Sequence, residues 1–397
     1  MALRIAHLVS HPIQYQAPLL RLLGNDNDLD LTVFFCSSSS TRRHFDRGFG
    51  REIVWDVPLL DGYKHEFLPA LRGTDTSNPT FRRPINYGLA KRLRHGRFDV
   101  LWVNGYFRWI NWVAIATAKQ LGMRTFVRDD VNLLRGRKAA NRAAKVLLFR
   151  WLRQACDGFL TIGSLNEQFY REYGVPPRKL FRVPFAVDND FFQKRATEAS
   201  GSREELRRSL GLEPGRPVIL FASKFIRRKR APDLWHAYKR LSPNGCDEPN
   251  PYLLFIGDGE ERAQLEAEVA QTKWSTVRFL GFANQSALPR YYDLCDVFVL
   301  PSVDEPFGLV VNEVMNVGRP IIVSDQVGCG PDLVKDGGNG YVFPAGNTVA
   351  LAQALQAVLG DPDRARSMGT RSLEIIQSWD YSENVRALKA AFLTASS

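Results

Sequence analysis

The chain is short of cysteine and of acid, and it has no long apolar run. Its cysteines are scattered without the spacing of metal ligands, and their odd number predicts free thiols in a reducing compartment. No segment approaches the roughly 18 apolar residues that a membrane-spanning helix needs, and the apolar start, MALRIAHLVS, is too short for a signal peptide. We therefore expect a cytoplasmic protein that is soluble or rests on the inner face of a membrane. The five cysteines are Cys36, Cys156, Cys246, Cys295 and Cys329.

The deficit of acid leaves a formal net charge of +11, from 53 Lys and Arg against 42 Asp and Glu. A charge of this size favours an acidic partner such as a sugar nucleotide, an anionic lipid head group or a nucleic acid. No known nucleic-acid-binding motif accompanies the charge. We therefore expect no nucleic-acid partner, and the charge leaves the other two classes open.

Apolar strand-like runs alternate with helical stretches along the chain, which predicts βα units in parallel sheets. The 397 residues are too many for one ordinary core and suit two domains. A polar stretch over 188–217, which contains KRATEASGSREE and LEPGRP, is interpreted as the crossing between the domains. The predicted strands are LRIAHLVS, LTVFFC, VLWVNG, RTFVRD and GFLTIG in the first half, then PVILFAS, YLLFIGDG, VRFLGF, VFVLPS and PIIVSD.

Two carboxylates, Glu305 and Glu313, stand eight residues apart in the segment EPFGLVVNE, directly after the apolar stretch VFVLPS. The pattern predicts a buried strand that ends at Pro301, a loop that holds Glu305 and a helix from Gly308 that holds Glu313. The free N–H groups of a first helical turn bind anions, and carboxylates accept hydrogen bonds from sugar hydroxyls. The element is therefore typical of a nucleotide-sugar site, although a surface helix that carries two acids has the same spacing.

The segment Arg278–Asn347, which contains this element, resembles the donor-binding half of the family-four retaining glycosyltransferases, the glycosyl transferases group 1. Three further segments resemble parts of the same family: FASKFIRRK over 221–229, FIGDGEERAQLE over 255–266 and PFAVDNDFF over 184–192. The resemblance implies an α/β protein with the GT-B fold, in which two Rossmann-like domains face each other across a cleft.

The resemblance also implies where the domains lie. We expect an N-terminal acceptor-side domain over 1–188 and a nucleotide-sugar-binding domain over 189–377. A C-terminal segment over 378–397 is expected to return to the first domain, with its helix over Tyr381–Thr394.

The family site implies roles for residues of the second half. Lys224 and Lys229 would stabilise the diphosphate as the glycosidic bond breaks, and Glu305 would lie beside the transferred sugar. Lys224 stands where the family usually has arginine, so it keeps the charge and loses the bidentate fork. Glu313 would bind the ribose hydroxyls. The remaining donor-binding residues implied are Phe307, Gly308 and Leu309 for the distal phosphate, the turn Gly257, Asp258 and Gly259, and Gly281 and Phe282 for the base.

The acceptor side is less defined by the sequence. The loop after the first strand, SHPIQYQAP, lacks the glycines usual in the family and offers His11, Gln14 and Tyr15 instead. Where many family members have a histidine after a strand, this chain has Asp129 and Asp130. These carboxylates either contact an acceptor hydroxyl or cap the following segment.

Two other charged segments have alternative interpretations. Asp188-Asn189-Asp190 has the spacing of a metal-binding DXD element, but it falls in the segment that resembles the domain crossing, and we expect no metal and no cofactor beyond the sugar nucleotide. The basic turn with Arg227, Arg228 and Arg230 is expected to be solvated. The stretch 135–153 has seven basic residues and no acidic one, with Lys138, Arg142 and Lys145 on one predicted helix face. It suits an anionic membrane or a lipid-diphosphate acceptor, or an ordinary solvated face whose Leu147, Leu148 and Trp151 fill a core.

The sequence thus predicts a retaining glycosyltransferase that transfers a sugar from a nucleoside-diphosphate-sugar to the hydroxyl of a glycan, lipid-linked or small-molecule acceptor. A sugar-nucleotide epimerase of the same two-domain build is the alternative. A glycosidase would need its two carboxylates on opposite sides of a scissile bond, and the glycine and helix between Glu305 and Glu313 favour phosphate instead.

Overall fold

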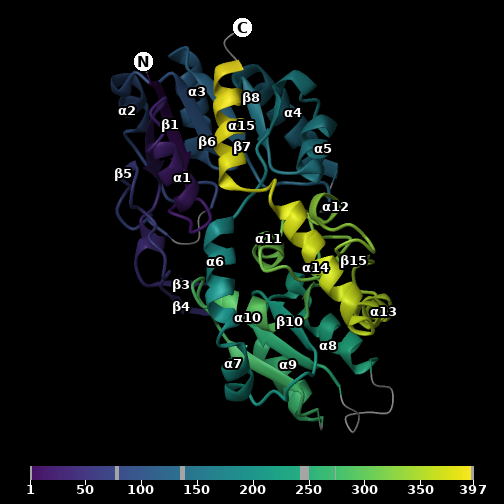
Figure 1. Cartoon of the computed structure of the whole chain (residues 1–397). Coiled ribbons are helices and arrows are strands. Elements are labelled where there is room, and N and C mark those ends of the chain that lie inside the picture. The colour runs from purple at the N-terminus through teal and green to yellow at the C-terminus, as the bar shows by residue number, and fades with distance from the viewer. Residues whose placement is uncertain (1, 77–79, 135–138, 242–249, 273, 395–397) are drawn as a thin grey trace. The chain divides into compact units, whose positions relative to one another are not determined.

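The computed structural model describes residues 2–76, 80–134, 139–241, 250–272 and 274–394, which form two compact units (Figure 1). The first unit contains the chain up to Phe45, the segment Glu52–Phe185 and the chain from Tyr381 onward. The second unit contains Ala186–Asp380 and also the short segment Asp46–Arg51. The chain therefore changes units at 185–186 and at 380–381, and it contributes six early residues to the later unit.

A seven-stranded parallel sheet organises the first unit, in the order β5-β2-β1-β6-β7-β8-β9. Its central strands are almost entirely buried because helices cover both faces of such a sheet. The strands are β1 (Leu3–Val9), β2 (Leu29–Phe35), β5 (Lys64–Phe67), β6 (Val100–Asn104), β7 (Arg124–Arg128), β8 (Gly158–Thr161) and β9 (Leu180–Arg182), and β3 (His44–Asp46) and β4 (Arg51–Ile53) form a separate pair.

The helices of the first unit are α1 (Ala17–Gly24), α2 (Leu89–Gly96), α3 (Trp109–Gln120), α4 (Ala139–Ala155), α5 (Ser164–Glu172) and α15 (Tyr381–Thr394). Aromatic rings of α4 and α5, with Phe159 of β8, fill the core. The C-terminal helix α15, predicted with these bounds, is fastened to the start of the chain. Its Tyr381 hydroxyl donates to the Tyr15 carbonyl (2.8 Å), and Lys389 pairs with Asp26 (2.9 Å).

A six-stranded parallel sheet organises the second unit, in the order β12-β11-β10-β13-β14-β15. Numbered along the chain within the unit, this order is 3-2-1-4-5-6, the Rossmann arrangement. The strands are β10 (Val218–Ala222), β11 (Tyr252–Ile256), β12 (Val277–Gly281), β13 (Val297–Leu300), β14 (Ile321–Ser324) and β15 (Gly340–Phe343).

The helices of the second unit lie before, between and after these strands in the chain. They are α6 (Asn189–Ser200), α7 (Arg203–Ser209), α8 (Ala231–Lys239), α9 (Arg262–Ala270), α10 (Leu288–Leu294), α11 (Leu309–Met315), α12 (Gly330–Leu333), α13 (Thr348–Leu359) and α14 (Pro362–Ile376). The fold class predicted from the alternating pattern is confirmed: both units are Rossmann-like α/β structures. Most of the polar stretch over 188–217, interpreted from the sequence as the crossing between domains, forms α6 and α7.

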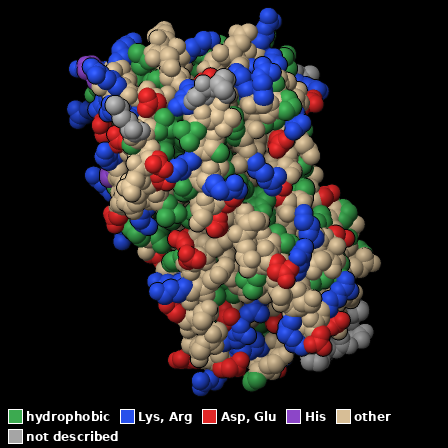
Figure 2. Space-filling model, turned by 45° about the horizontal axis from the view of Figure 1, so that its top comes forward, with side chains coloured by type: hydrophobic (Ala, Val, Ile, Leu, Met, Phe, Trp, Pro, Cys, Tyr) green, Lys and Arg blue, Asp and Glu red, His purple; other side chains and the backbone are tan. Residues whose placement is uncertain are grey.

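The four described cysteines, Cys36, Cys156, Cys295 and Cys329, are free and buried, and Cys246 lies outside the described residues. Burial raises the pKa of Cys36 and of Cys295 to about 12. Among the described residues, no helix combines the length and the apolar character that crossing a membrane requires. Figure 2 shows basic side chains spread over one face of the molecule, with acidic side chains among them.

Candidate functional site

The predicted donor residues follow the carboxyl ends of β10 and β13, the two neighbouring strands between which the strand order of the second unit reverses. Lys224 and Lys229 come after β10, and Glu305 comes after β13. In open α/β sheets, ligands bind beyond the carboxyl ends of the strands at this switch point. The topology therefore places residues from distant parts of the sequence around one binding position.

Lys229 and Glu305 form a buried ion pair at this position. The Nζ of Lys229 lies 2.5 Å from Oε2 of Glu305, and both side chains are about nine-tenths buried. Burial lowers the pKa of Lys229, and the charge and hydrogen bond of Glu305 oppose that shift, so the carboxylate helps to keep the amine charged. Arg228 lies 3.5 Å from the same oxygen. The prediction that this basic turn is solvated is therefore wrong for Arg228. It holds for Arg227, which is exposed, and Arg230 is half-buried and pairs with the neighbouring Asp233 (2.8 Å).

Glu313 is buried inside α11, with 1% of its surface exposed. Helix α11 begins after Gly308, which has a φ of +99° that favours glycine. The hydroxyl of Tyr292, from α10, donates to Oε2 of Glu313 at 2.5 Å. The loop position of Glu305 and the helix position of Glu313 are confirmed, and the alternative of a surface helix with two exposed acids is wrong.

Lys224 lies in contact with the segment Asp46–Arg51, which belongs to the same unit. Its Nζ lies 2.9 Å from both carboxylate oxygens of Asp46 and 4.5 Å from the ring centre of Phe49. Burial works to raise the pKa of Asp46, but the hydrogen bonds and charge of Lys224 prevail and lower it. The rings of Phe49 and Phe282 also pack edge to face, with their centres 4.9 Å apart. The predicted phosphate-binding lysine and the predicted base-binding ring thus share neighbours on one short segment.

The turn Gly257-Asp258-Gly259 packs against the loop that follows β10. A Cβ on Gly257 would overlap the carbonyl oxygen of Ser223, and a Cβ on Gly259 would lie 2.5 Å from the carbonyl oxygen of Phe225. Asp258 accepts a hydrogen bond from the Gly259 amide (3.0 Å). The glycines are needed here because two loops of the protein approach each other closely.

The predicted acceptor residues belong to the first unit and follow β1 and β7. His11 is partly buried, and its Nδ1 lies 2.9 Å from the Ser10 hydroxyl. Asp129 is partly buried and accepts a hydrogen bond from the Val131 amide (3.2 Å), which is a local capping contact. Burial raises the pKa of Asp129 to about 7, aided by the charge of Asp130 and a hydrogen bond shared with it and opposed by Lys145.

This shift predicts a pH-dependent stability. The folded chain holds the Asp129 proton up to about pH 7, whereas the unfolded chain loses it near the ordinary pKa of 3.8. The free energy of unfolding therefore falls as the pH rises through this interval, and the loss is complete above about pH 7. We expect Asp129→Asn to raise the melting temperature by a few degrees at about pH 8 and to change it little at about pH 4.

Thermal melts at both pH values measure this difference. Asp363→Asn is the matched control, because the Asp363 side chain is 89% exposed. Equal effects of Asp129→Asn at the two pH values would contradict the assigned pKa.

The Asp188–Asp190 segment has a structural role. Oδ1 of Asp188 accepts a hydrogen bond from the Phe191 amide (2.9 Å) and so caps the start of α6. Within the part of the chain that the structure describes, no group of three or more His, Cys, Asp or Glu side chains is arranged to hold a metal ion.

The predicted basic helix face is only partly as expected. Lys138 lies outside the described residues. The Nζ of Lys145 lies 4.8 Å from the ring centre of Phe169 and is directed at core aromatic rings, and Arg142 pairs with Glu172 at 2.6 Å. Leu147 does not fill a core, because it is 68% exposed. The outer face of α4 is therefore more apolar than the sequence suggested.

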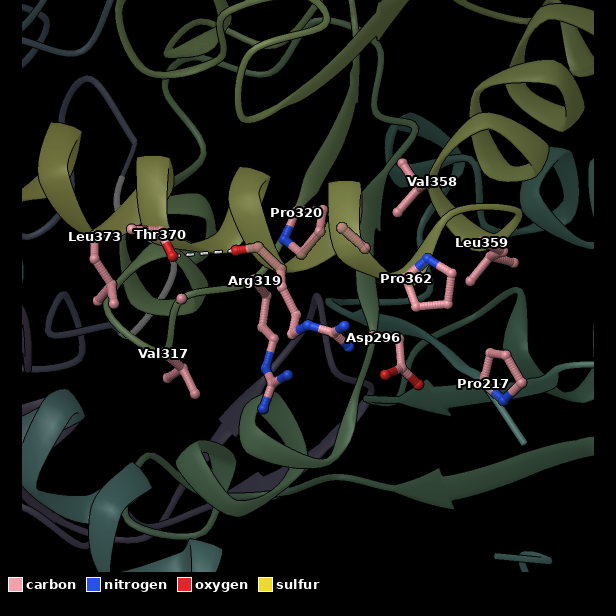
Figure 3. Close-up of a pocket in the computed structure, with 13 residues that line it drawn as sticks. Pro217, Asp296, Val317, Arg319, Pro320, Val358, Leu359, Pro362, Thr370 and Leu373 are labelled. Atoms are coloured by element: carbon pink, nitrogen blue, oxygen red, sulfur yellow. Dashed lines mark hydrogen bonds between the residues drawn. The ribbon is translucent and has the colours of Figure 1, made fainter. Parts of the chain in front are cut away.

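A pocket of about 380 Å³ lies at the opposite edge of the second sheet, at the amino ends of β10, β13 and β14 (Figure 3). Its Asp296 accepts a hydrogen bond from the amide of Val218, where β10 begins (2.7 Å). The Asp296 carboxylate therefore stabilises the start of β10. None of the predicted donor residues lines the pocket.

Solved structures share this architecture over the whole chain. Sucrose-phosphate synthase from Thermosynechococcus elongatus matches with a TM-score of 0.70 at 20% identity, covering 99% of this chain and 98% of that one. HepE from Anabaena, in complex with UDP, matches with a TM-score of 0.73 at 15% identity, covering 98% and 99%. At such identities the likeness shows the fold alone, and that fold is GT-B.

A family model matches most of the second unit. Residues 202–374 match the family model described as glycosyl transferases group 1. The alpha-D-kanosaminyltransferase of Streptomyces kanamyceticus is 28% identical over 218 residues, which cover 55% of this chain and 54% of that enzyme. The chain thus spans about half the length of the curated relatives that it matches. The match of residues 202–374 to this family model confirms the resemblance found in the sequence.

Proposed function

We propose that the chain is a retaining glycosyltransferase that transfers a sugar from a nucleoside-diphosphate-sugar to an acceptor hydroxyl. The observation that carries the proposal is the buried Lys229–Glu305 pair, with Arg228 beside it, at the switch point of the second sheet. Cationic groups at this position stabilise the negative charge that a diphosphate leaving group gains, and this stabilisation is greatest in the transition state.

The donor would be held by groups from the loops after β10, β11 and β13. Lys229, Arg228 and Lys224 would hold the diphosphate, with the amides near Gly308 at its distal phosphate. Glu305, fixed by Lys229, would accept hydrogen bonds from the transferred sugar. Glu313, fixed by Tyr292, would accept hydrogen bonds from the ribose hydroxyls. Phe307, Leu309, Asp258 and Phe282 would complete the donor site.

Lys224 would exchange its partner when the donor binds. Its Nζ is held by the Asp46 carboxylate. A diphosphate carries more negative charge than this single carboxylate and would attract the lysine more strongly. His11, Asp129 and Asp130 would bind the acceptor, which is a glycan, a lipid-linked sugar or a small molecule. The donor's own phosphate would accept the proton of the acceptor hydroxyl, without a metal or another cofactor.

A uridine nucleotide is the donor class that we propose. HepE, whose fold this chain shares, was solved in complexes with UDP and with UDP-glucose. The epimerase alternative gains no support, because the matching family model and the alpha-D-kanosaminyltransferase are both named for sugar transfer. We further propose peripheral contact with an anionic membrane, because residues 135–153 include seven basic residues and no acidic one.

The test is a panel of nucleotide-sugars offered with a panel of acceptors, with and without EDTA. We expect one UDP-sugar to release UDP only when an acceptor is present, with the anomeric configuration of the sugar retained in the product. EDTA is expected to leave the rate unchanged, since no metal has a role in the proposed site.

Three results would contradict the proposal. Conversion of the donor into its epimer without an acceptor would identify an epimerase. An inverted anomeric configuration in the product would exclude the retaining mechanism. Loss of turnover in EDTA that manganese restores would return Asp188 and Asp190 to consideration as metal ligands.

A further inference from the structure

Helices α3 and α4 of the first unit line an apolar groove of about 460 Å³. Three tryptophans line it, Trp109 and Trp112 from α3 and Trp151 from α4, together with Val113 and Leu148. The ring centres of Trp112 and Trp151 lie 6.4 Å apart. The indole N–H of Trp112 donates a hydrogen bond to the Tyr106 carbonyl (2.7 Å). Neighbouring aromatic rings therefore form part of the groove wall.

Apolar side chains are exposed at the start of α3 and on the outer face of α4. Phe107 and Trp109 are 64% and 56% exposed, and Val146 and Leu147 on the outer face of α4 are 50% and 68% exposed. The inner face of α4 packs in the hydrophobic core, where Phe149 and Leu152 are fully buried. Half of the eight large hydrophobic residues of the described chain that are at least 50% exposed lie at the start of α3 or on α4. Apolar surface gathered in this way marks an interaction site.

The two helices that line the groove carry positive charge. Together, α3 and α4 contain five Lys and Arg residues, Lys119, Arg142, Lys145, Arg150 and Arg153. Neither α3 nor α4 contains an acidic residue. Arg142 and Arg150 are exposed on α4 beside Val146 and Leu147. The surface thus combines indole rings, aliphatic side chains and cations.

We propose that this α3–α4 surface docks on an anionic phospholipid bilayer, with Trp109, Val146 and Leu147 entering the boundary between head groups and acyl chains. Tryptophan prefers that boundary because its ring is apolar and its N–H is polar. The basic residues are complementary to anionic head groups, and interfacial helices combine these two features. This inference rests on the proposed membrane contact and assigns a surface to it. The apolar residues carry the contact together with the charge, rather than Lys138, Arg142 and Lys145 alone.

The experiment is sedimentation of the full chain with vesicles of phosphatidylcholine alone or mixed with phosphatidylglycerol. We expect wild-type protein to bind the mixed vesicles at low salt, to bind them less at high salt, and to show tryptophan quenching by brominated acyl chains. Val146→Glu is expected to weaken binding at least about tenfold, because a charge at the acyl boundary is unfavourable. The matched control is Val349→Glu on α13, where the valine is 48% exposed, and it should bind like wild type.

A second variant separates charge from insertion. Leu147→Lys adds a positive charge and removes an apolar contact, so it should retain salt-sensitive binding and lose much of the quenching. UDP affinity is measured for every variant and should stay unchanged, which shows that the variants are folded and that the donor site is independent of docking.

Each failure has a separate meaning. Wild-type protein that ignores the mixed vesicles at low salt overturns both the membrane contact and its surface. Equal binding by the Val146 and Val349 variants overturns the surface alone. A wild-type dimer that Val146→Glu converts to a monomer assigns the surface to a second copy of the chain. None of these outcomes affects the proposed sugar transfer, which is tested by UDP release.

Discussion

Replacing Lys229 by alanine is expected to lower kcat about 100- to 1000-fold. The Lys229 amine is the most deeply placed cation of the candidate donor site and lies 2.5 Å from Glu305. Loss of one preorganised group that stabilises developing charge typically has an effect of about this size. Steady-state kinetics with the UDP-sugar identified by the panel measure it, and the KM for the donor should change less than kcat.

The single substitution also breaks a buried pair, which destabilises a protein by about 3–5 kcal/mol. The double variant Lys229→Met with Glu305→Gln removes both charges and should melt closer to wild type while remaining equally inactive. Lys239→Ala is the matched control, because Lys239 pairs with Glu268 at 3.3 Å on the surface of the same unit. A stable double variant with normal kcat would show that the pair is purely structural.

Glu313→Gln is expected to weaken UDP binding by about 10- to 100-fold. Glutamine keeps the shape of this buried side chain and removes the charge, and a hydrogen bond to a charged group contributes about 1.5–3 kcal/mol. If the lost bonds are those to ribose, the variant and the wild type should bind 2′,3′-dideoxy-UDP with similar affinity. Calorimetry with both nucleotides provides the comparison.

Tyr292→Phe is the control for this experiment. It removes the hydroxyl that donates to Glu313 and leaves the carboxylate in place, so UDP affinity should fall only a few-fold. If Glu313→Gln binds UDP like wild type while it stays folded, Glu313 has no role in ribose binding. If it weakens both nucleotides equally, the carboxylate acts on packing rather than on the ribose.

The fold could be predicted from the sequence because the central strands are continuous apolar runs. All ten predicted runs correspond to strands. The clearest of them, β10, β11 and β13, are buried at every residue, since a strand covered on both faces must be apolar throughout. The missed strands are short and lie at sheet edges or in the separate pair. β5 has the sequence KHEF and alternates exposed with half-buried residues, and β9 has only three residues. Their pairing partners, rather than their own patterns, make them strands.

The candidate site was predictable in its residues and not in their contacts. The sequence selected Lys229 and Glu305 separately, but they are 76 residues apart and only the parallel pairing of β10 with β13 brings them together. Asp46 had no sequence signal at all, because it precedes its partner Lys224 by 178 residues, at the end of the short strand β3. Arg228 looked like one of several solvated arginines, and its contact with Glu305 depends on the turn that also holds Lys229.

The close approach of the glycine turn after β11 to the loop after β10 has a consequence for interpreting variants. Because Gly257 and Gly259 touch the backbone of Ser223 and Phe225, the two loops must shift together if either one shifts. Lys224 stands between those two residues in the sequence, so a methyl group on either glycine would displace the lysine without touching a ligand. The two loops together fix the position of the Lys224 amine. Lower activity of an alanine variant in the turn would therefore reflect a displaced Lys224 rather than a lost contact between the turn and a phosphate.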